Sequence, residues 1–245
     1  MLLGEEALEL LHRKSVLVFG VGGVGGYAAE ALARSGVGHL SLVDNDRVAL
    51  SNLNRQLYAL HSTIGQYKVD VAAARIHDID PDIDVRVYRT FYLPETAQEF
   101  DFSSYDYIVD AIDTVTAKLD IIERADRLRI PVISAMGCGN RTDPTKLTVT
   151  DIYKTSMDPL ARVMRRELKK RGVKALKVVC STEPALHRLQ EGGAPGASPD
   201  SRGGAADPAP GSARRSIPGS TAFVPAAAGM ILASEVVRTL ISPES

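Results

Sequence analysis

Short apolar runs alternate with amphipathic stretches over the first 135 residues of the chain. Ser15 to Phe19 is a continuous apolar run, followed by glycines and then by helix formers from Tyr27 to Arg34. Continuous apolar runs of this length are typical of parallel strands buried on both faces. The same pattern predicts further strands at 39–43, 85–88, 107–109 and 131–134, and helices at 68–79 and 115–128. This alternation predicts a Rossmann-like, doubly wound, mostly parallel α/β sheet.

The pattern changes in the second half, which we expect to form a C-terminal extension. It predicts strands at 146–152 and 177–180, a basic helix at 158–170, and an apolar helix at 226–241 that packs back on the sheet. Gly, Ala, Pro and Ser dominate residues 190–216, a composition that predicts a mobile surface loop. We therefore expect a single domain over residues 1–245. Its nucleotide-binding core spans 14–135, and its substrate-binding extension spans 140–245.

The composition excludes several classes of protein. Of the 245 residues 44% are apolar, and 29 Lys and Arg against 30 Asp and Glu leave a net charge of −1. Only a local basic patch can therefore support nucleic-acid binding. The two cysteines, Cys138 and Cys180, form no CxxC pair, so we expect neither a disulfide framework nor a zinc site. The acidic start is unlike a secretory signal, and the longest apolar tract falls short of the roughly 20 residues that span a bilayer. We expect a cytoplasmic protein without a membrane partner.

A glycine-rich turn joins the first predicted strand to the first predicted helix. Gly20, Gly22, Gly23 and Gly25 permit a tight turn and let a phosphate approach backbone amides at the helix N-terminus. Asp44 ends the second predicted strand, where a carboxylate can accept hydrogen bonds from ribose hydroxyls. These residues predict a nucleotide site, and their spacing alone does not distinguish NAD from ATP.

The segment after the second predicted strand distinguishes between NAD and ATP through a family resemblance. Its motif residues are Asp44, Asp46, Val48, Ser51, Asn52, Arg55, Gln56, Gly65 and Lys68, and a D-x-x-D motif follows at Asp110 and Asp113. In these motifs the chain resembles the ThiF/MoeB/HesA superfamily, relatives of the ubiquitin-activating enzymes, over roughly residues 14 to 135. The resemblance implies ATP-dependent activation of a carboxylate, with Asp113 near the ATP phosphates and Mg²⁺.

The chemistry of adenylation agrees with these residue types. A carboxylate attacks the α-phosphate of ATP, so cations must neutralise negative charge in the transition state. Arg55 and Lys68 are the expected catalytic cations, and Asp113 is expected to hold Mg²⁺ through the phosphates. Asn52 can donate to phosphate or ribose oxygens, and the resemblance also places Gln56 and Asp46 in the ATP site. Asp110, at the strand end, is expected to brace the following helix.

Motifs at the start of the chain and in its second half indicate one branch of the superfamily. They are Leu3-Gly4-Glu5-Glu6, Asp143-Pro144-Thr145, Asp151-Ile152-Tyr153, Asp158-Pro159-Leu160, Ser181-Thr182-Glu183 and Pro218-Gly219-Ser220. Here the chain resembles the tRNA threonylcarbamoyladenosine dehydratase family. The resemblance implies that ATP activates the threonyl carboxylate of threonylcarbamoyladenosine beside the tRNA anticodon, and that ring closure follows with loss of water. It also implies a homodimer and a link to a cysteine desulfurase or sulfur-acceptor system.

The basic helix fits an RNA substrate. Eight cations fall between residues 162 and 177 against a single acid, Glu167. Such a run suits a track of RNA phosphates, and the alternative is an ordinary solvated helix face. The expected tRNA-binding residues are Arg162, Arg165, Arg166, Lys169, Lys170 and Arg171. The apolar neighbours of Cys180 predict a buried, inert thiol, and we interpret Cys138 as structural.

Three other functions stay open at this level. The first is a sulfur-carrier protein adenylyltransferase of the ThiF/MoeB type, although the chain lacks the two CxxC pairs usual there. The second, an NAD-dependent oxidoreductase, has no residues arranged for hydride transfer, and the third is a non-catalytic scaffold for a cysteine desulfurase. The resemblance also implies an arginine-bearing segment upstream of Leu3 that reaches a partner's ATP. Since the sequence begins at Met1, we expect a truncated start or reduced activity.

Overall fold

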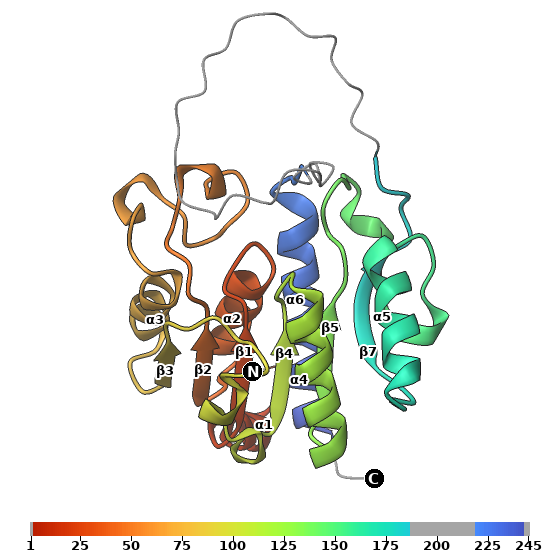
Figure 1. Ribbon diagram of the computed structural model, residues 1–245. Coiled ribbons are helices and arrows are strands. Elements are labelled where there is room, and N and C mark those ends of the chain that lie inside the picture. Colours follow the sequence, from red (N-terminus) through yellow and green to blue (C-terminus); the bar gives the residue numbers. More distant parts are fainter. Residues whose placement is uncertain (1, 187–218, 243–245) are drawn as a thin grey trace, which may run out of the picture.

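Seven strands form one sheet in the computed structural model, which describes residues 2–186 and 219–242 (Figure 1). Their order is β3-β2-β1-β4-β5-β7-β6, and only β6 runs antiparallel to its neighbour within the described part of the chain. The strands are β1 (Ser15–Phe19), β2 (His39–Val43), β3 (Asp84–Tyr88), β4 (Tyr107–Asp110), β5 (Val132–Ala135), β6 (Leu147–Asp151) and β7 (Lys177–Ser181). The predicted doubly wound, mostly parallel sheet is confirmed.

Helices cover both faces of this sheet. They are α1 (Glu5–His12), α2 (Gly25–Arg34), α3 (Lys68–Ile79), α4 (Val115–Leu128), α5 (Pro159–Lys170) and α6 (Phe223–Leu240). The helices α2, α3 and α6 share one hydrophobic cluster with the sheet, and α4 and α5 pack on the other face. Figure 1 shows α4 and α5 in front of the strands and α6 behind them.

The predicted elements lie within three residues of the observed ones. The sequence analysis missed α1 and the reversed direction of β6. The loop expected at 190–216 lies outside the described residues. Strands from the nucleotide-binding core and from the extension join in the same sheet, because β7 pairs with β5.

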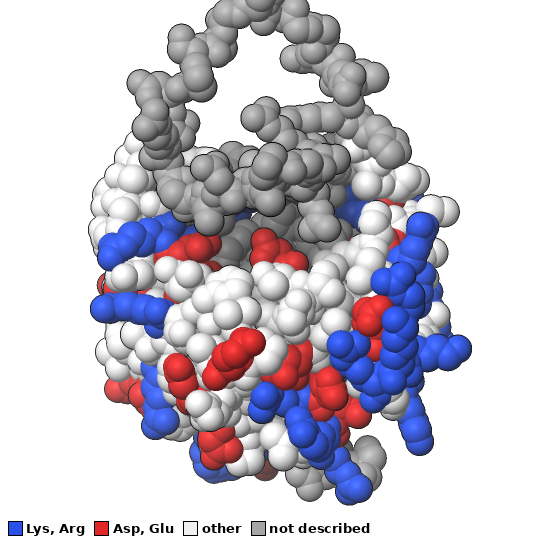
Figure 2. Space-filling view, viewed as in Figure 1, with Lys and Arg blue, Asp and Glu red and all other residues white. Residues whose placement is uncertain are grey.

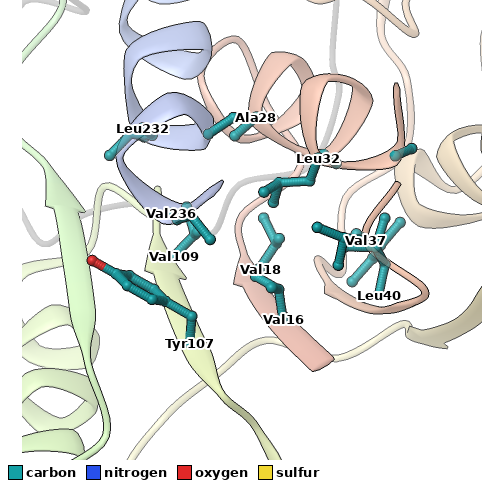
Figure 3. Packing of buried hydrophobic residues seen from close by; sticks show 14 of the residues in the cluster. Val16, Val18, Ala28, Leu32, Val37, Leu40, Tyr107, Val109, Leu232 and Val236 are labelled. Carbon is teal, nitrogen blue, oxygen red and sulfur yellow. The ribbon is translucent and has the colours of Figure 1, made fainter. Parts of the chain in front are cut away.

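Alternating side chains of the central strands divide the core into two layers. Val16 and Val18 of β1 face α2 and α6, whereas Leu17 and Phe19 face the layer that contains α4. Figure 3 shows the first of these layers, where Leu232 and Val236 of α6 pack beside Ala28 and Leu32 of α2 and Tyr107 and Val109 of β4. This alternation is what a strand buried on both faces produces.

The contact between α2 and α6 is a close approach of backbones. A Cβ atom added at Gly229 would lie 2.3 Å from the carbonyl oxygen of Val24 and 2.7 Å from Cβ of Tyr27. Any larger residue at 229 would push α6 away from the start of α2. The 18 residues of α6 have a mean hydropathy of 1.4, long and apolar enough to cross a membrane by composition alone. Half of them are buried within the fold, as expected for a core helix.

Candidate nucleotide site

The topology places a crevice at the carboxyl ends of β1 and β4. From β1 the chain builds outward to β2 and β3, and then returns to β4 on the opposite side of β1. In doubly wound sheets a ligand binds at this reversal, beyond the carboxyl ends of the strands. The loops after β1 and β4 therefore lie side by side and form opposite walls of the site.

A cavity of about 660 Å³ occupies this position. Its volume is in the range usual for small-molecule sites, roughly 300–1,000 Å³. Ten of the eleven residues expected to bind ATP line it, namely Gly20, Gly22, Gly23, Asp44, Asp46, Asn52, Arg55, Gln56, Lys68 and Asp113. The other one, Gly25, is the first residue of α2. The structure thus brings together residues that are up to 93 positions apart in the chain.

Two glycines of the turn after β1 are required by its geometry. Gly20 has a φ of 84°, and a Cβ atom there would lie 2.8 Å from the carbonyl oxygen of Ala111. A Cβ atom at Gly25 would lie 1.8 Å from the carbonyl oxygen of Gly20. The backbone amides of Gly22 and Gly23 donate to no acceptor within the described residues. They lie just before the N-terminus of α2, where an anion is favoured.

Asp44 holds the shape of this turn. One carboxylate oxygen accepts from the amide of Val21 and the other from the amide of Asp46, each at 2.8 Å. Burial raises the pKa of Asp44, although nearby Lys68 and the two amides act in the opposite direction. Asp44 therefore fixes the glycine turn in addition to lining the cavity.

The two expected catalytic cations occupy the same wall of the cavity. Nζ of Lys68 is buried and lies 2.6 Å from Oδ2 of Asp46. The guanidinium of Arg55 donates to the carbonyl oxygen of Ser51 and to Oδ1 of Asn54, both at 2.9 Å. The side-chain oxygen of Asn52 accepts from the amide of Ala49 at 3.0 Å, which shapes the short 3-10 helix Leu50–Asn52 that precedes Arg55. These contacts orient the cations before any nucleotide arrives.

Asp113 lies in the loop after β4 and is exposed at the cavity. Its nearest recorded partner is the hydroxyl of Thr114, at 3.4 Å. The carboxylate is thus available to an incoming cation. The described residues contain no cluster of three or more His, Cys, Asp or Glu side chains that could hold a metal ion. A metal beside Asp113 would need further ligands from a bound phosphate.

A buried ion pair supports the loop that carries Asp113. Nζ of Lys118 donates to Oδ2 of Asp110 at 2.9 Å, to Oγ of Ser134 at 3.1 Å and to the carbonyl oxygen of Ala135 at 2.8 Å. Both charged side chains are 0% exposed. Lys118 is in α4, so the expected bracing of the following helix by Asp110 is confirmed.

The sequence analysis missed Lys118 and Ser134. A signal was present, because Lys118, Ile121, Ile122 and Ala125 have the spacing of one helix face, and a lysine interrupts an otherwise apolar stripe. A lysine on such a stripe indicates a buried carboxylate partner.

The two cysteines lie in different surroundings. Cys180 in β7 is buried, as expected, and burial raises the pKa of its thiol. Cys138 follows β5 and lines the cavity. Burial raises the pKa of Cys138 to about 12, with the charge of Asp158 acting in the same direction. Neither thiol is activated as a nucleophile at neutral pH.

The basic helix α5 presents its cations unequally. Figure 2 shows Lys and Arg gathered over this helix, at the right-hand edge of the molecule. The guanidinium of Arg165, in contrast, turns toward Thr155 and donates to its carbonyl and hydroxyl oxygens. Glu167 forms ion pairs with Arg166, Lys170 and Arg171, and hydrogen bonds from Lys170 and Arg166 hold its pKa down at about 2.

Three cations of α5, one of them the Glu167 partner Arg166, share one exposed side. Arg162, Arg166 and Lys169 are spaced i, i+4 and i+7, which places them on one helix face. All three are exposed. We refer to these three residues as the α5 basic face. Arg165, which was expected beside them, is half-buried and already bound to Thr155.

The fold and the cavity define a nucleotide-binding α/β protein with two cations and a carboxylate placed around a phosphate-binding turn. The ThiF family model matches residues 1–245, and the chain belongs to the ThiF family.

Similar proteins point to one branch of this family. The chain is 44% identical to the tRNA threonylcarbamoyladenosine dehydratase of Bacillus subtilis, over 98% of this chain and 91% of that protein. It is 39% identical to the dehydratase of the same name from Escherichia coli, over 78% of this chain and 74% of that protein. The crystal structure of the E. coli dehydratase in complex with ATP superimposes with a TM-score of 0.81 at 34% identity, covering 98% of this chain and 90% of that one.

Proposed function

We propose that this protein is an ATP-dependent tRNA threonylcarbamoyladenosine dehydratase. It activates the threonyl carboxylate of threonylcarbamoyladenosine, and ring closure then gives the cyclic form with net loss of water. The main support is the cavity at the β1–β4 reversal, where the glycine turn, two cations and Asp113 converge. Similarity to dehydratases along almost the whole chain favours this function over adenylation of a sulfur-carrier protein.

The cavity residues fit ATP and give each group a separate task. The amides of Gly22 and Gly23, which have no acceptor among the described residues, would bind the phosphates, and Asp44 is in the position for a ribose. Arg55 and Lys68 neutralise charge on the phosphates while the carboxylate attacks. Asp113 and the phosphate oxygens are suitable ligands for Mg²⁺, which would polarise the phosphates when bound.

The RNA substrate is assigned to the extension. The α5 basic face provides three exposed cations on a helix whose first turn reaches the cavity, where Leu160 is one of the lining residues. Phosphates of the anticodon arm bound along α5 would bring the modified base toward the nucleotide. We propose that the nucleotide-binding core and the extension act together as a single domain over residues 1–245. We also propose that the protein acts in the cytoplasm.

Conversion of the modified nucleoside tests the proposed function directly. Purified protein, ATP, Mg²⁺ and tRNA bearing threonylcarbamoyladenosine should yield the cyclic nucleoside, detected by mass analysis after digestion of the tRNA. Omission of ATP is the control and should leave the nucleoside unchanged. Unchanged nucleoside in the complete mixture, together with pyrophosphate exchange that requires a carrier protein ending in Gly-Gly, would favour the sulfur-carrier alternative.

The superfamily resemblance also supports a homodimer. We propose that two copies pair so that each nucleotide site is completed near the N-terminal segment of its partner. Sedimentation at micromolar concentration should give about twice the monomer mass of 26.3 kDa. A monomer at that concentration would contradict the pairing and leave the nucleotide chemistry of a single chain intact.

A further inference from the structure

The cavity extends beyond Asp113 to a second wall, at the end of β5 and the start of α5. We call this the β5 wall, which consists of Met136, Gly137, Cys138, Gly139 and Leu160. The glycine turn and Asp44 belong to β1 and β2, on the other side of β4 in the strand order. If the nucleotide occupies the side with the phosphate-binding turn, the β5 wall is left for the group whose carboxylate attacks the α-phosphate.

Buried charges hold both backbone polar groups of one residue in this wall, Gly137. Oδ2 of Asp158 accepts from the amide of Gly137 at 2.9 Å, and Nε of Arg141 donates to its carbonyl oxygen at 3.0 Å. The side chains of Arg141 and Asp158 are 1% and 0% exposed, and they approach each other to 3.6 Å. A Cβ atom at Gly137 would lie 3.3 Å from Oδ1 of Asp158, so this carboxylate lies directly against the wall.

The same carboxylate begins the basic helix. Asp158 is the N-cap of α5, and its Oδ1 accepts from the amide of Ala161 at 3.1 Å. One side chain therefore joins the β5 wall to the helix that carries the α5 basic face. Gly137 and Asp158 are 21 residues apart in the chain, so their contact arises only in the folded structure.

An ion pair this deeply buried is not explained by stability. Removing two charges from water costs more than packing apolar side chains of similar volume, so buried pairs are weak stabilisers. An N-cap alone does not require a charge either, because Ser, Thr and Asn cap helices about as well as Asp. What the carboxylate adds is a second acceptor, and that acceptor holds Gly137.

We propose that Asp158 is a positioning residue that keeps the β5 wall in register with α5, so that RNA bound along the helix presents its carboxylate correctly to the nucleotide. This inference rests on the proposed function. Catalysis by positioning is sensitive to small displacements, and a shift of about 1 Å can cost on the order of 100-fold in rate. Loss of the Asp158–Gly137 contact should therefore impair the reaction of the RNA and spare ATP binding.

Two substitutions separate the roles of this carboxylate. Asp158→Asn keeps the shape and removes the charge. Asp158→Ser keeps a good helix cap and is too short to reach Gly137 as well. Asp151→Asn is the matched control, because Asp151 also accepts from two backbone amides in the extension, those of Tyr153 at 2.8 Å and Leu176 at 3.0 Å. Asp151 does not line the cavity.

The experiment measures the ATP dissociation constant, the thermal midpoint, and kcat and KM for the modified tRNA. We expect both Asp158 variants to bind ATP within about twofold of wild type and to lose on the order of 100-fold in kcat/KM for tRNA. Asp151→Asn should retain wild-type kcat/KM. Equal losses in the Asp151 and Asp158 variants, or full activity of Asp158→Ser, would overturn the inference, because they would assign Asp158 only a structural or capping role.

The wild-type protein separates this inference from the function on which it rests. Wild-type protein that binds ATP and leaves the tRNA unchanged would overturn the proposed function, and the positioning role with it. Active wild type, with Asp158 variants that behave like the control, would overturn the positioning role alone.

Discussion

Nζ of Lys68 lies 2.6 Å from Oδ2 of Asp46, inside the cavity that we assign to ATP. The lysine is 7% exposed and the aspartate 62%, so the cation is sheltered while its partner remains in contact with solvent. A phosphate entering the cavity would compete with Asp46 for the same ammonium group. Asp46 thus orients the Lys68 side chain in the free protein, and the nucleotide then shares or replaces this contact.

Removing the Lys68 ammonium should weaken nucleotide binding. Lys68→Met keeps the length of the side chain and removes its charge-assisted hydrogen bonds. Such bonds contribute about 1.5–3 kcal/mol, so the ATP dissociation constant should rise on the order of 10- to 100-fold. Calorimetric titration with ATP measures this change. Lys14→Met is the control, since Lys14 pairs with Asp106 at 2.9 Å without lining the cavity. Equal ATP affinity in both variants would remove Lys68 from the nucleotide site.

Removing the Asp113 carboxylate should abolish ATP turnover and leave the fold intact. Asp113 is exposed, and its nearest recorded contact is the 3.4 Å one with Thr114, so Asp113→Ala removes no buried interaction. The Mg²⁺-bound phosphates would lose their protein ligand. Steady-state ATP consumption with modified tRNA is the measurement, and Asp126→Ala, an exposed position in α4, is the control. Undiminished turnover with normal Mg²⁺ dependence would exclude this role.

The α5 basic face should determine the salt dependence of tRNA binding. Replacing Arg162, Arg166 and Lys169 by Ala should lower the slope of log K against log salt by about 2–3, since each lost phosphate contact accounts for roughly 0.7–0.9. A variant with Arg86, Arg127 and Arg238 replaced by Ala removes the same charge from exposed positions elsewhere. Parallel titration lines for the two variants would identify α5 as an ordinary solvated face.

Replacing only one partner of the buried Lys118–Asp110 pair should destabilise the fold. Lys118→Met leaves the carboxylate of Asp110 buried with only neutral partners, which destabilises a protein by about 3–5 kcal/mol. Urea denaturation should show this loss as a lower midpoint. The double variant Lys118→Met/Asp110→Asn removes both charges and should recover much of the stability. A double variant less stable than the single one would show that the two charges do not compensate each other.

The thiol of Cys138 should be almost unreactive at pH 8 despite its place in the cavity wall. With a pKa of about 12, on the order of 10⁻⁴ of it is thiolate at that pH. In the unfolded chain about a quarter of each thiol would be ionised. Iodoacetamide labelling followed by peptide mass analysis should therefore modify Cys138 only after unfolding in guanidinium. Rapid labelling of the native protein would contradict a raised pKa.

The raised pKa of Cys138 also makes the stability of the folded protein depend on pH. A thiol whose pKa is raised by folding is held in its neutral form, so its contribution is complete below the unfolded value of about 8.5. That contribution should fall progressively as the pH rises from 8.5 toward 12. Comparison with Cys138→Ala over this range isolates the effect, because the alanine variant lacks the titrating group.

Most strands and helices could be predicted because their signals are local. The apolar run of Ser15–Phe19 is enough to predict a buried strand. The helical spacing of apolar residues predicts the helix from Val115 to Leu128. The direction of β6 could not be read, since it depends on pairing Val149 with Val179, 30 residues away. The short helix α1 was missed because the acidic start was tested against a secretory signal and used as a family motif, and its helical periodicity was not examined.

The candidate site was predictable as a set of residues and not as a set of contacts. The motifs named ten of the residues that line the cavity, and their spacing carried no information about partners. Lys68 binding Asp46 and Arg165 turning toward Thr155 both arise from the folded arrangement of distant segments. Asp158 likewise read only as part of a family motif, because its contact with Gly137 joins two separate elements.

The close packing of Gly229 against Val24 makes the nucleotide turn depend on residues near the far end of the chain. The helix that begins at Gly25 has its apolar side covered by α6, which is translated about 200 residues later. During synthesis the ATP-binding segment would therefore emerge from the ribosome before α6, the helix that supports it, has been translated. Nascent chains that stop before residue 223 should be substrates for chaperones and proteases, even though they contain every residue of the ATP motifs.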